Sequence, residues 1–218
     1  IPHPTTELLM LVPFFSAQDA CTAVAAIFKA GITPSALEFM ERDALLWTQD
    51  FLKDNSIIIQ ENHAAHLLIE VDGFNQDVLM EECTKIMDVL AHFETDEILF
   101  ADSASQKDKL WRLRRTVGEA VKSHSIYKEE DTVVPRFELP KLLAHVKLIG
   151  DKFGFKSVCY GHAGDGNLHV NIIKGDMTDD NWNNELPKGI REIFHLTKDQ
   201  NNNRHRSVDS LHFEYLKR

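Results

Sequence analysis

The sequence has few of the residues that mark thiolate metal sites, disulfide frameworks or membrane spans. Its three cysteines, Cys21, Cys83 and Cys159, are scattered without CxxC spacing. This excludes a thiolate metal site or a disulfide framework and fits a reducing compartment. The longest apolar run, residues 8–15, is too short to span a membrane. We therefore expect a cytoplasmic protein without a membrane span.

Basic residues are also scarce. The chain has 24 Lys and Arg against 34 Asp and Glu, a formal net charge of −10 at pH 7. Surfaces that bind nucleic acid need clustered positive charge, so we expect no nucleic-acid partner. With 7 Pro, 10 Gly and 43% hydrophobic residues, the composition is that of an ordinary globular protein.

Strand and helix patterns alternate along the 218 residues. The predicted strands are residues 8–12, 36–40, 66–71, 97–101, 126–134, 156–163 and 167–173. The predicted helices are residues 17–30, 42–52, 75–93, 106–122, 139–153 and 180–196. This order favours an α+β, ferredoxin-like fold, in which helices pack on one face of a largely antiparallel sheet.

Two helix boundaries and a domain limit can also be predicted. Ser16 is the expected N-cap of the first helix, and Gly31 is expected to end it. Residues 197–218 are polar and lack periodicity, so we interpret them as a surface tail outside a domain formed by residues 1–196.

Residues 160–171 are the most informative stretch. Asp165-Gly166 lies between two extended runs, which predicts a hairpin closed by a two-residue type I′ turn. In that register His162 faces His169 across the strands, and Tyr160 faces Asn171. Because side chains alternate along a strand, these four polar side chains share one face, and the aliphatic residues between them face the core.

Two imidazoles opposite each other on neighbouring strands have Cβ atoms about 5 Å apart, close enough to bind one divalent cation. A catalytic metal site also needs a third protein ligand and an open position for a substrate oxygen. The alternative is that both histidines face solvent or bond to a nearby loop. The glycines around them and the polar face favour the ligand-binding interpretation.

Three stretches carry a resemblance to a known family. Residues 161–169, GHAGDGNLH, resemble the GHxGDGNLH signature of the C-terminal domain of FAD-linked oxidases, a family that includes D-lactate, glycolate and D-2-hydroxyglutarate dehydrogenases. Residues 31–40 are similar to the family's GxxPxALExM stretch, and residues 110–114 to its LWxxR motif.

The resemblance implies a role for five residues. His162 and His169 would bind a divalent metal, often zinc, that holds the 2-hydroxyl and carboxylate of the substrate. Asn171 would contact the substrate, and Arg114 would pair with its carboxylate, for which a planar guanidinium is well suited. Lys128 would be a second basic contact. For Arg114 and Lys128, ordinary surface ion pairing remains the alternative.

The resemblance also implies what the chain does not carry. The family's downstream Gly-Glu-His-Gly motif, whose Glu completes the metal site and whose His takes the hydroxyl proton, is not found, so no residue is assigned a catalytic role. The FAD would be bound mainly by another domain of the same protein. We therefore expect a substrate-binding fragment of a flavin-dependent 2-hydroxy-acid dehydrogenase, inactive alone. The start without Met suggests a chain cut from a longer one.

Two other functions remain open. One is a non-enzymatic, ferredoxin-like binding or assembly module, in which exposed apolar surface promotes homo-oligomers. The other is a metal-dependent hydrolase, for which Glu129, Glu130 and Asp131 are the candidate bases.

Overall fold

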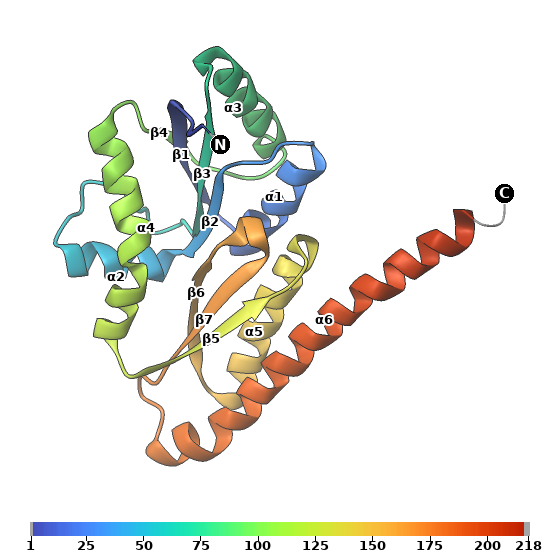
Figure 1. The fold of residues 1–218 in the computed structure, drawn as a ribbon. Helices are drawn as coiled ribbons and strands as arrows, with labels where there is room; N and C mark the ends of the chain where they lie inside the picture. Colours follow the sequence, from blue (N-terminus) through green and yellow to red (C-terminus); the bar gives the residue numbers. More distant parts are fainter. Residues whose placement is uncertain (1, 216–218) are drawn as a thin grey trace.

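A single antiparallel sheet of seven strands runs through the protein (Figure 1). The structure, a computed structural model, describes the backbone of residues 2–215 and the side chains of residues 2–200. The strand order is β4-β1-β3-β2-β6-β7-β5, and every pair of neighbours is antiparallel. The strands are β1 (Thr6–Phe14), β2 (Ala36–Glu41), β3 (Ala65–Gly73), β4 (Leu99–Phe100), β5 (Tyr127–Val133), β6 (Lys156–Gly161) and β7 (Asn167–Ile173).

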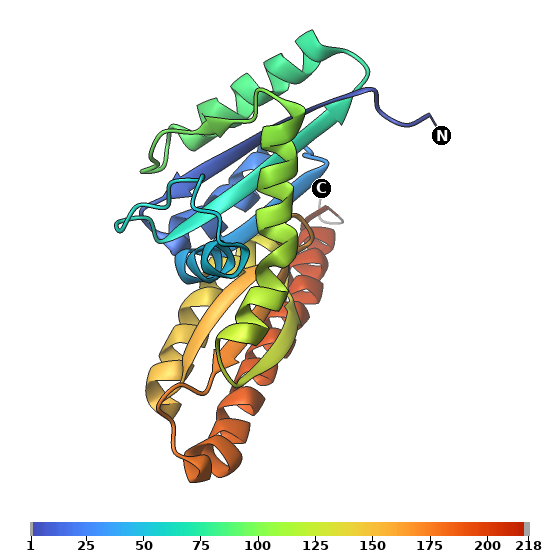
Figure 2. The ribbon, with the colours of Figure 1, turned by 90° about the vertical axis from the view of Figure 1, so that its left-hand side faces the viewer.

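Helices cover both faces of this sheet. They are α1 (Ala17–Lys29), α2 (Arg42–Leu52), α3 (Gln76–Leu90), α4 (Ala104–His124), α5 (Leu139–Phe153) and α6 (Leu186–Tyr215). The larger core lies between the sheet and α1, α3, α5 and the first part of α6. A smaller core lies on the opposite face, under α2 and α4 (Figures 1 and 2). The α+β fold with an antiparallel sheet is therefore confirmed, and the α2–α4 layer is an addition to the helices expected on one face.

Local sequence signals set several helix ends. Ser16 caps α1 through its Oγ, which accepts a hydrogen bond from the backbone N–H of Asp19 at 3.2 Å. Gly31, just after α1, has a φ of 80°, which a side chain would disfavour. Both boundaries agree with the prediction. Ser103 caps α4 in the same way, bonding the N–H of Gln106 at 3.3 Å.

Two segments differ from the sequence prediction. The strand expected at residues 97–101 is only two residues long, because regular pairing with β1 is limited to Leu99 and Phe100. The residues after 196, expected to be an irregular tail, continue α6 to Tyr215, so that part of the secondary structure was predicted wrongly. Thr197 and Gln200 are buried on this helix.

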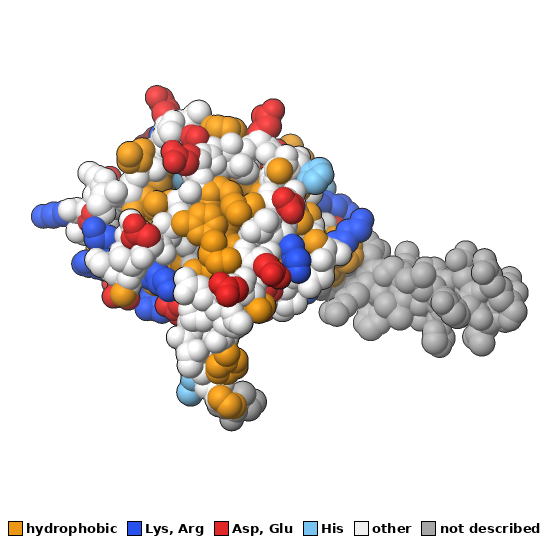
Figure 3. All heavy atoms as spheres, turned by 90° about the horizontal axis from the view of Figure 1, so that it is seen from above, with side chains coloured by type: hydrophobic (Ala, Val, Ile, Leu, Met, Phe, Trp, Pro, Cys, Tyr) orange, Lys and Arg blue, Asp and Glu red, His pale blue; other side chains and the backbone are white. Residues whose placement is uncertain are grey.

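The surface carries exposed apolar side chains. Seen from above, hydrophobic side chains gather at the centre of the molecule with charged side chains around them (Figure 3). Large exposed apolar side chains include Phe74 before α3 and Val78 and Met80 in its first turns. In the part of the chain that the structure describes, no helix combines the length and apolarity needed to cross a membrane.

Candidate active site

The β6–β7 hairpin has a longer loop than the predicted type I′ turn. Tyr160 pairs with His169, and the chain then leaves β6 at Gly161 and makes one short 3₁₀ turn, Ala163–Asp165. The backbone N–H groups of Asp165 and Asn167 both donate to the carbonyl of His162, at 2.9 and 3.1 Å. The predicted pairing of His162 with His169 is therefore wrong.

Gly166 explains why the loop takes this shape. Its φ is 75°, and a Cβ at this position would lie 2.0 Å from the carbonyl oxygen of Val134. The hairpin tip is thus pressed against the segment that follows β5, where the N–H of Val134 donates to the Gly166 carbonyl at 2.9 Å. The register differs from the predicted one by two residues, so every side chain keeps its predicted face.

Tyr160, His169 and Asn171 consequently share one face of the sheet, as expected. The Tyr160 and His169 rings have centroids 5.2 Å apart, and the His162 ring lies 6.1 Å from that of His169 at an interplanar angle of 73°. The His162 side chain is 56% exposed and that of His169 is 23% exposed. The structure therefore places the two imidazoles side by side at the surface, although they are not cross-strand partners.

Arg114 reaches this face from α4, where it is paired with a buried carboxylate. Its Nε donates to Oε2 of Glu38 at 2.8 Å, and its Nη2 lies 2.8 Å from the same oxygen. Both side chains are 8% exposed. The guanidinium carbon also lies 5.4 Å from the centroid of the Tyr160 ring. Arg114 is thus held beside the histidines by an ion pair, as in the alternative interpretation, but this pair is buried and not on the surface.

Acidic side chains of β5 lie next to His169. Its Nδ1 is 3.3 Å from Oε1 of Glu129 and 3.4 Å from Oδ1 of Asp131, without a well-directed hydrogen bond to either. The Nδ2 of Asn171 is also buried without a well-directed hydrogen bond among the described residues, and the Asn171 side chain lies close enough to the Tyr160 hydroxyl to interact with it. Buried polar atoms without partners are uncommon in folded proteins and mark positions where a ligand can bond. Burial, with Glu129 nearby, raises the pKa of Tyr160, so its phenol stays protonated.

Lys128 does not join this cluster. It pairs with Ile172, whose side chain is in the larger core, so it projects from the face opposite to His169. There its Nζ lies 5.2 Å from the ring centroid of Trp182. The alternation of side chains along β5 is the physical reason. Glu130, one of the carboxylates considered for a hydrolase, points to that opposite face as well.

The two histidines supply two nitrogen ligands but not a complete metal site. Among the described residues, no group of three or more His, Cys, Asp or Glu side chains is placed to hold a metal ion. The exposed imidazole of His162 and the imidazole of His169, which lies beside Glu129 and Asp131, have the chemistry that zinc prefers. A metal bound by these two imidazoles would take its remaining ligands from water or from residues outside those described.

One site residue, Glu38, was not predicted. Its Oε1 lies 2.9 Å from Nδ1 of His162, while its Oε2 binds Arg114. A signal was present in the sequence, since Glu38 is a carboxylate within the apolar strand pattern of residues 36–40. Buried carboxylates are rare unless they are paired, so its position indicated a partner but not which one.

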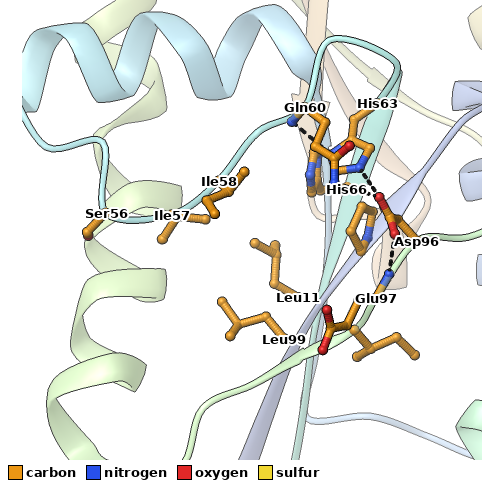
Figure 4. Close-up of a pocket in the computed structure, with 12 residues that line it drawn as sticks. Leu11, Ser56, Ile57, Ile58, Gln60, His63, His66, Asp96, Glu97 and Leu99 are labelled. Atoms are coloured by element: carbon orange, nitrogen blue, oxygen red, sulfur yellow. Dashed lines mark hydrogen bonds and ion pairs between the residues drawn. The ribbon is translucent and has the colours of Figure 1, made fainter.

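A separate pocket opens further along the same face of the sheet (Figure 4). It has a volume of about 330 Å³, and His63, His66 and Asp96 line it together with aliphatic side chains. Nε2 of His63 lies 3.0 Å from Oδ2 of Asp96, whereas both ring nitrogens of His66 are buried without a hydrogen-bond partner. Burial lowers the pKa of His66 to about 3. His66 is therefore uncharged in the folded protein near neutral pH.

A comparison with protein families matches residues 3–197 to the FAD linked oxidases, C-terminal domain. The chain therefore belongs to this family. It is 27% identical over 199 residues to D-lactate dehydrogenase from Anaerostipes hadrus, covering 89% of this chain and 42% of that protein. It is 31% identical over 201 residues to glycolate oxidase subunit GlcD from Bacillus subtilis, covering 89% of this chain and 40% of that protein.

The curated relatives extend well beyond the matched region. The chain is 32% identical over 154 residues to D-2-hydroxyglutarate–pyruvate transhydrogenase DLD3 from Saccharomyces cerevisiae, covering 66% of this chain and 31% of that protein. The chain thus spans about two-fifths, or less, of the length of these relatives.

Solved structures support the fold. An alkyldihydroxyacetonephosphate synthase superposes with a TM-score of 0.60 at 12% identity, covering 91% of this chain and 40% of that chain. A p-cresol methylhydroxylase superposes with a TM-score of 0.57 at 14% identity, covering 92% of this chain and 44% of that chain. At these identities the likeness concerns the fold alone.

Proposed function

We propose that these residues form the substrate-holding part of a flavin-dependent 2-hydroxy-acid dehydrogenase, which transfers hydride from C2 of a D-2-hydroxy acid to FAD. The observation that carries the proposal is the convergence of Arg114, His162, His169 and Asn171 on one face of the sheet. Three relatives are named for lactate, glycolate and 2-hydroxyglutarate, which all share a hydroxyl group beside a carboxylate.

Each of these side chains has a role that its contacts permit. Arg114 has guanidinium N–H groups beyond those of Nε and Nη2 that face Glu38, and these pair with the substrate carboxylate. The Nδ2 of Asn171, which has no well-directed hydrogen bond among the described residues, donates to a substrate oxygen. His162 and His169 supply two ligands of a divalent metal, zinc in our proposal, which when bound would stabilise the alkoxide that develops at C2.

The remaining parts of the proposal concern the whole protein. We propose that FAD is bound mainly by another domain of the same protein, and that the 218 residues alone do not turn over. No described residue is proposed as the base that takes the hydroxyl proton. Lys128 is not included among the substrate contacts, because its side chain leaves the opposite face of the sheet. A cytoplasmic location and self-association belong to the same proposal.

Zinc binding by the chain tests the histidine pair. Calorimetric titration of the 218-residue protein should show one site that disappears in His162→Ala and in His169→Ala. His195→Ala is the matched control, because His195 is exposed on α6, far along the chain from the hairpin, and its loss should leave the site unchanged. Equal binding by all four proteins would contradict the assignment of the histidines as ligands.

Turnover tests the substrate role. In a complete enzyme that contains this region and the flavin domain, His162→Ala should abolish oxidation of the 2-hydroxy acid while the flavin absorption spectrum and thermal unfolding stay near wild type. Retained activity in a folded, flavin-loaded variant would show that His162 is not part of the substrate-binding site.

A further inference from the structure

One carboxylate, Glu38, contacts two of the predicted site residues at once. Its Oε2 accepts a hydrogen bond from Nε of Arg114 at 2.8 Å, and its Oε1 lies 2.9 Å from Nδ1 of His162. The Glu38 side chain is 8% exposed, whereas the His162 ring is mostly open to solvent. The buried carboxylate therefore fixes the position of one ring nitrogen of His162, while the rest of the ring stays exposed to solvent.

The sheet register explains this meeting of residues that are distant in sequence. Phe39 pairs with Gly161 and Met40 with Tyr160 where β2 and β6 run antiparallel. Continuing that register by one residue places Glu38 across from His162, just beyond the end of β6. Arg114 comes from α4, which packs over the same face and contributes to the smaller core. The three stretches that resemble the family motifs thus meet at Glu38.

The chemistry of the three groups restricts where the proton of the Glu38–His162 contact can lie. An ionised carboxylate has no proton to donate, and a guanidinium can only donate. A hydrogen bond between Oε1 of Glu38 and Nδ1 of His162 therefore requires the proton to be on Nδ1. In the neutral ring the lone pair is then on Nε2, the nitrogen that faces away from Glu38.

We propose that Glu38 is a positioning residue that holds His162 as the Nδ1–H tautomer and so presents the Nε2 lone pair to whatever binds at the site. This inference rests on the proposed function and deepens it, because Nε2 would then be the nitrogen of His162 that binds a metal or accepts a proton. Carboxylates that accept from the second nitrogen of a ligand histidine fix both the tautomer and the ring orientation. The sequence resemblance assigned roles to Arg114 and His162 but none to Glu38.

The substitution Glu38→Gln reverses the donor pattern with little change of shape. Because Arg114 has only donors, the amide oxygen of the new side chain must turn toward it, and the amide nitrogen then faces His162. Nδ1 of His162 has to accept, so the proton moves to Nε2. Glu130→Gln is the matched control, because Glu130 lies on the opposite face of the sheet and does not contact His162.

Nitrogen NMR of ¹⁵N-histidine-labelled protein, at a pH where the ring is neutral, reads the tautomer directly. His162 is assigned from the signals missing in His162→Asn. Wild type and Glu130→Gln should show a protonated Nδ1 and an unprotonated Nε2, and Glu38→Gln should show the reverse. A wild-type His162 with its proton on Nε2, or an unchanged pattern in Glu38→Gln, would overturn the proposal. If Glu38→Gln does not fold, the wild-type spectrum alone decides.

Zinc affinity gives a second readout that separates this inference from the proposed function. Glu38→Gln should weaken zinc binding about 10- to 100-fold, as is typical when such a carboxylate is removed from a ligand histidine. If neither protein binds zinc but the tautomer reverses, the metal assignment fails and the role of Glu38 stands. If both bind zinc equally and the tautomer does not change, the metal assignment stands and the role of Glu38 is refuted.

Discussion

His66 makes the folded protein sensitive to mild acid. Its side chain is fully buried, and burial together with the neighbouring His63 lowers its pKa from 6.5 to about 3. In the unfolded chain the same ring takes up a proton near pH 6.5. Between these two pH values the unfolded state binds one more proton than the folded state, so the free energy of unfolding must fall as the pH falls.

The size of this effect follows from the shift. The contribution of His66 is fully present above pH 6.5 and is lost on acidification by about 1.4 kcal/mol per pH unit once the unfolded ring is protonated. Between pH 7.5 and pH 5 this amounts to about 2 kcal/mol. Since domains are commonly stable by about 5–15 kcal/mol, the loss is large enough to measure.

Urea unfolding followed by circular dichroism, repeated from pH 7.5 to pH 5, measures this dependence. We compare wild type with His66→Leu, which fills the buried position with an apolar side chain that takes up no proton. His195→Leu, on the exposed surface of α6, is the control. His66→Leu should lose about 2 kcal/mol less than the other two proteins over this range. Parallel curves for all three proteins would refute the assignment of a neutral, buried His66.

Two further changes test the packing of the site. Gly166→Ala should lower the free energy of unfolding by about 2 kcal/mol or more, because it places an L residue at positive φ and a Cβ against the Val134 carbonyl. Gly175→Ala is the control. Gly175 has a φ of 48° and open space around it, so this substitution should lower the free energy of unfolding less in the same urea assay. Arg114→Met should cost about 3–5 kcal/mol by leaving the buried Glu38 carboxylate without the guanidinium that neutralises it. The double variant with Glu38→Leu should recover much of that loss, and equal losses in the single and double variants would contradict this account.

Local signals were sufficient to predict most of the fold. The cap at Ser16, the φ of Gly31 and the helix at 42–52 depend on residues within one or two turns of each other, and the structure agrees with all three. The face shared by Tyr160, His169 and Asn171 was also predictable, because alternation along a strand does not depend on the exact register.

Contacts between distant segments were not predictable in the same way. The hairpin register was wrong because Asp165-Gly166 indicates a two-residue turn locally, whereas the actual loop is shaped by the contact of Gly166 with Val134, which lies 32 positions earlier. The partnership of Glu38 with Arg114 joins residues 76 positions apart and depends on α4 packing across the sheet. Neither contact leaves a periodic pattern in the sequence.

The charges around the site bear on how it would hold an anion. With Lys128 on the opposite face, the hydrogen bonds and ring contacts of the described residues place the basic side chain of Arg114 in this cluster. Arg114 is paired with Glu38, while the carboxylates of Glu129 and Asp131 lie beside His169. A 2-hydroxy acid is itself an anion, and carboxylates this close repel it. A divalent cation on the histidine pair, or basic residues from the rest of the protein, would reverse that balance. We therefore expect the acid to bind this region only together with such positive charge, so that a cation, if the proposed metal site exists, would take part in substrate binding.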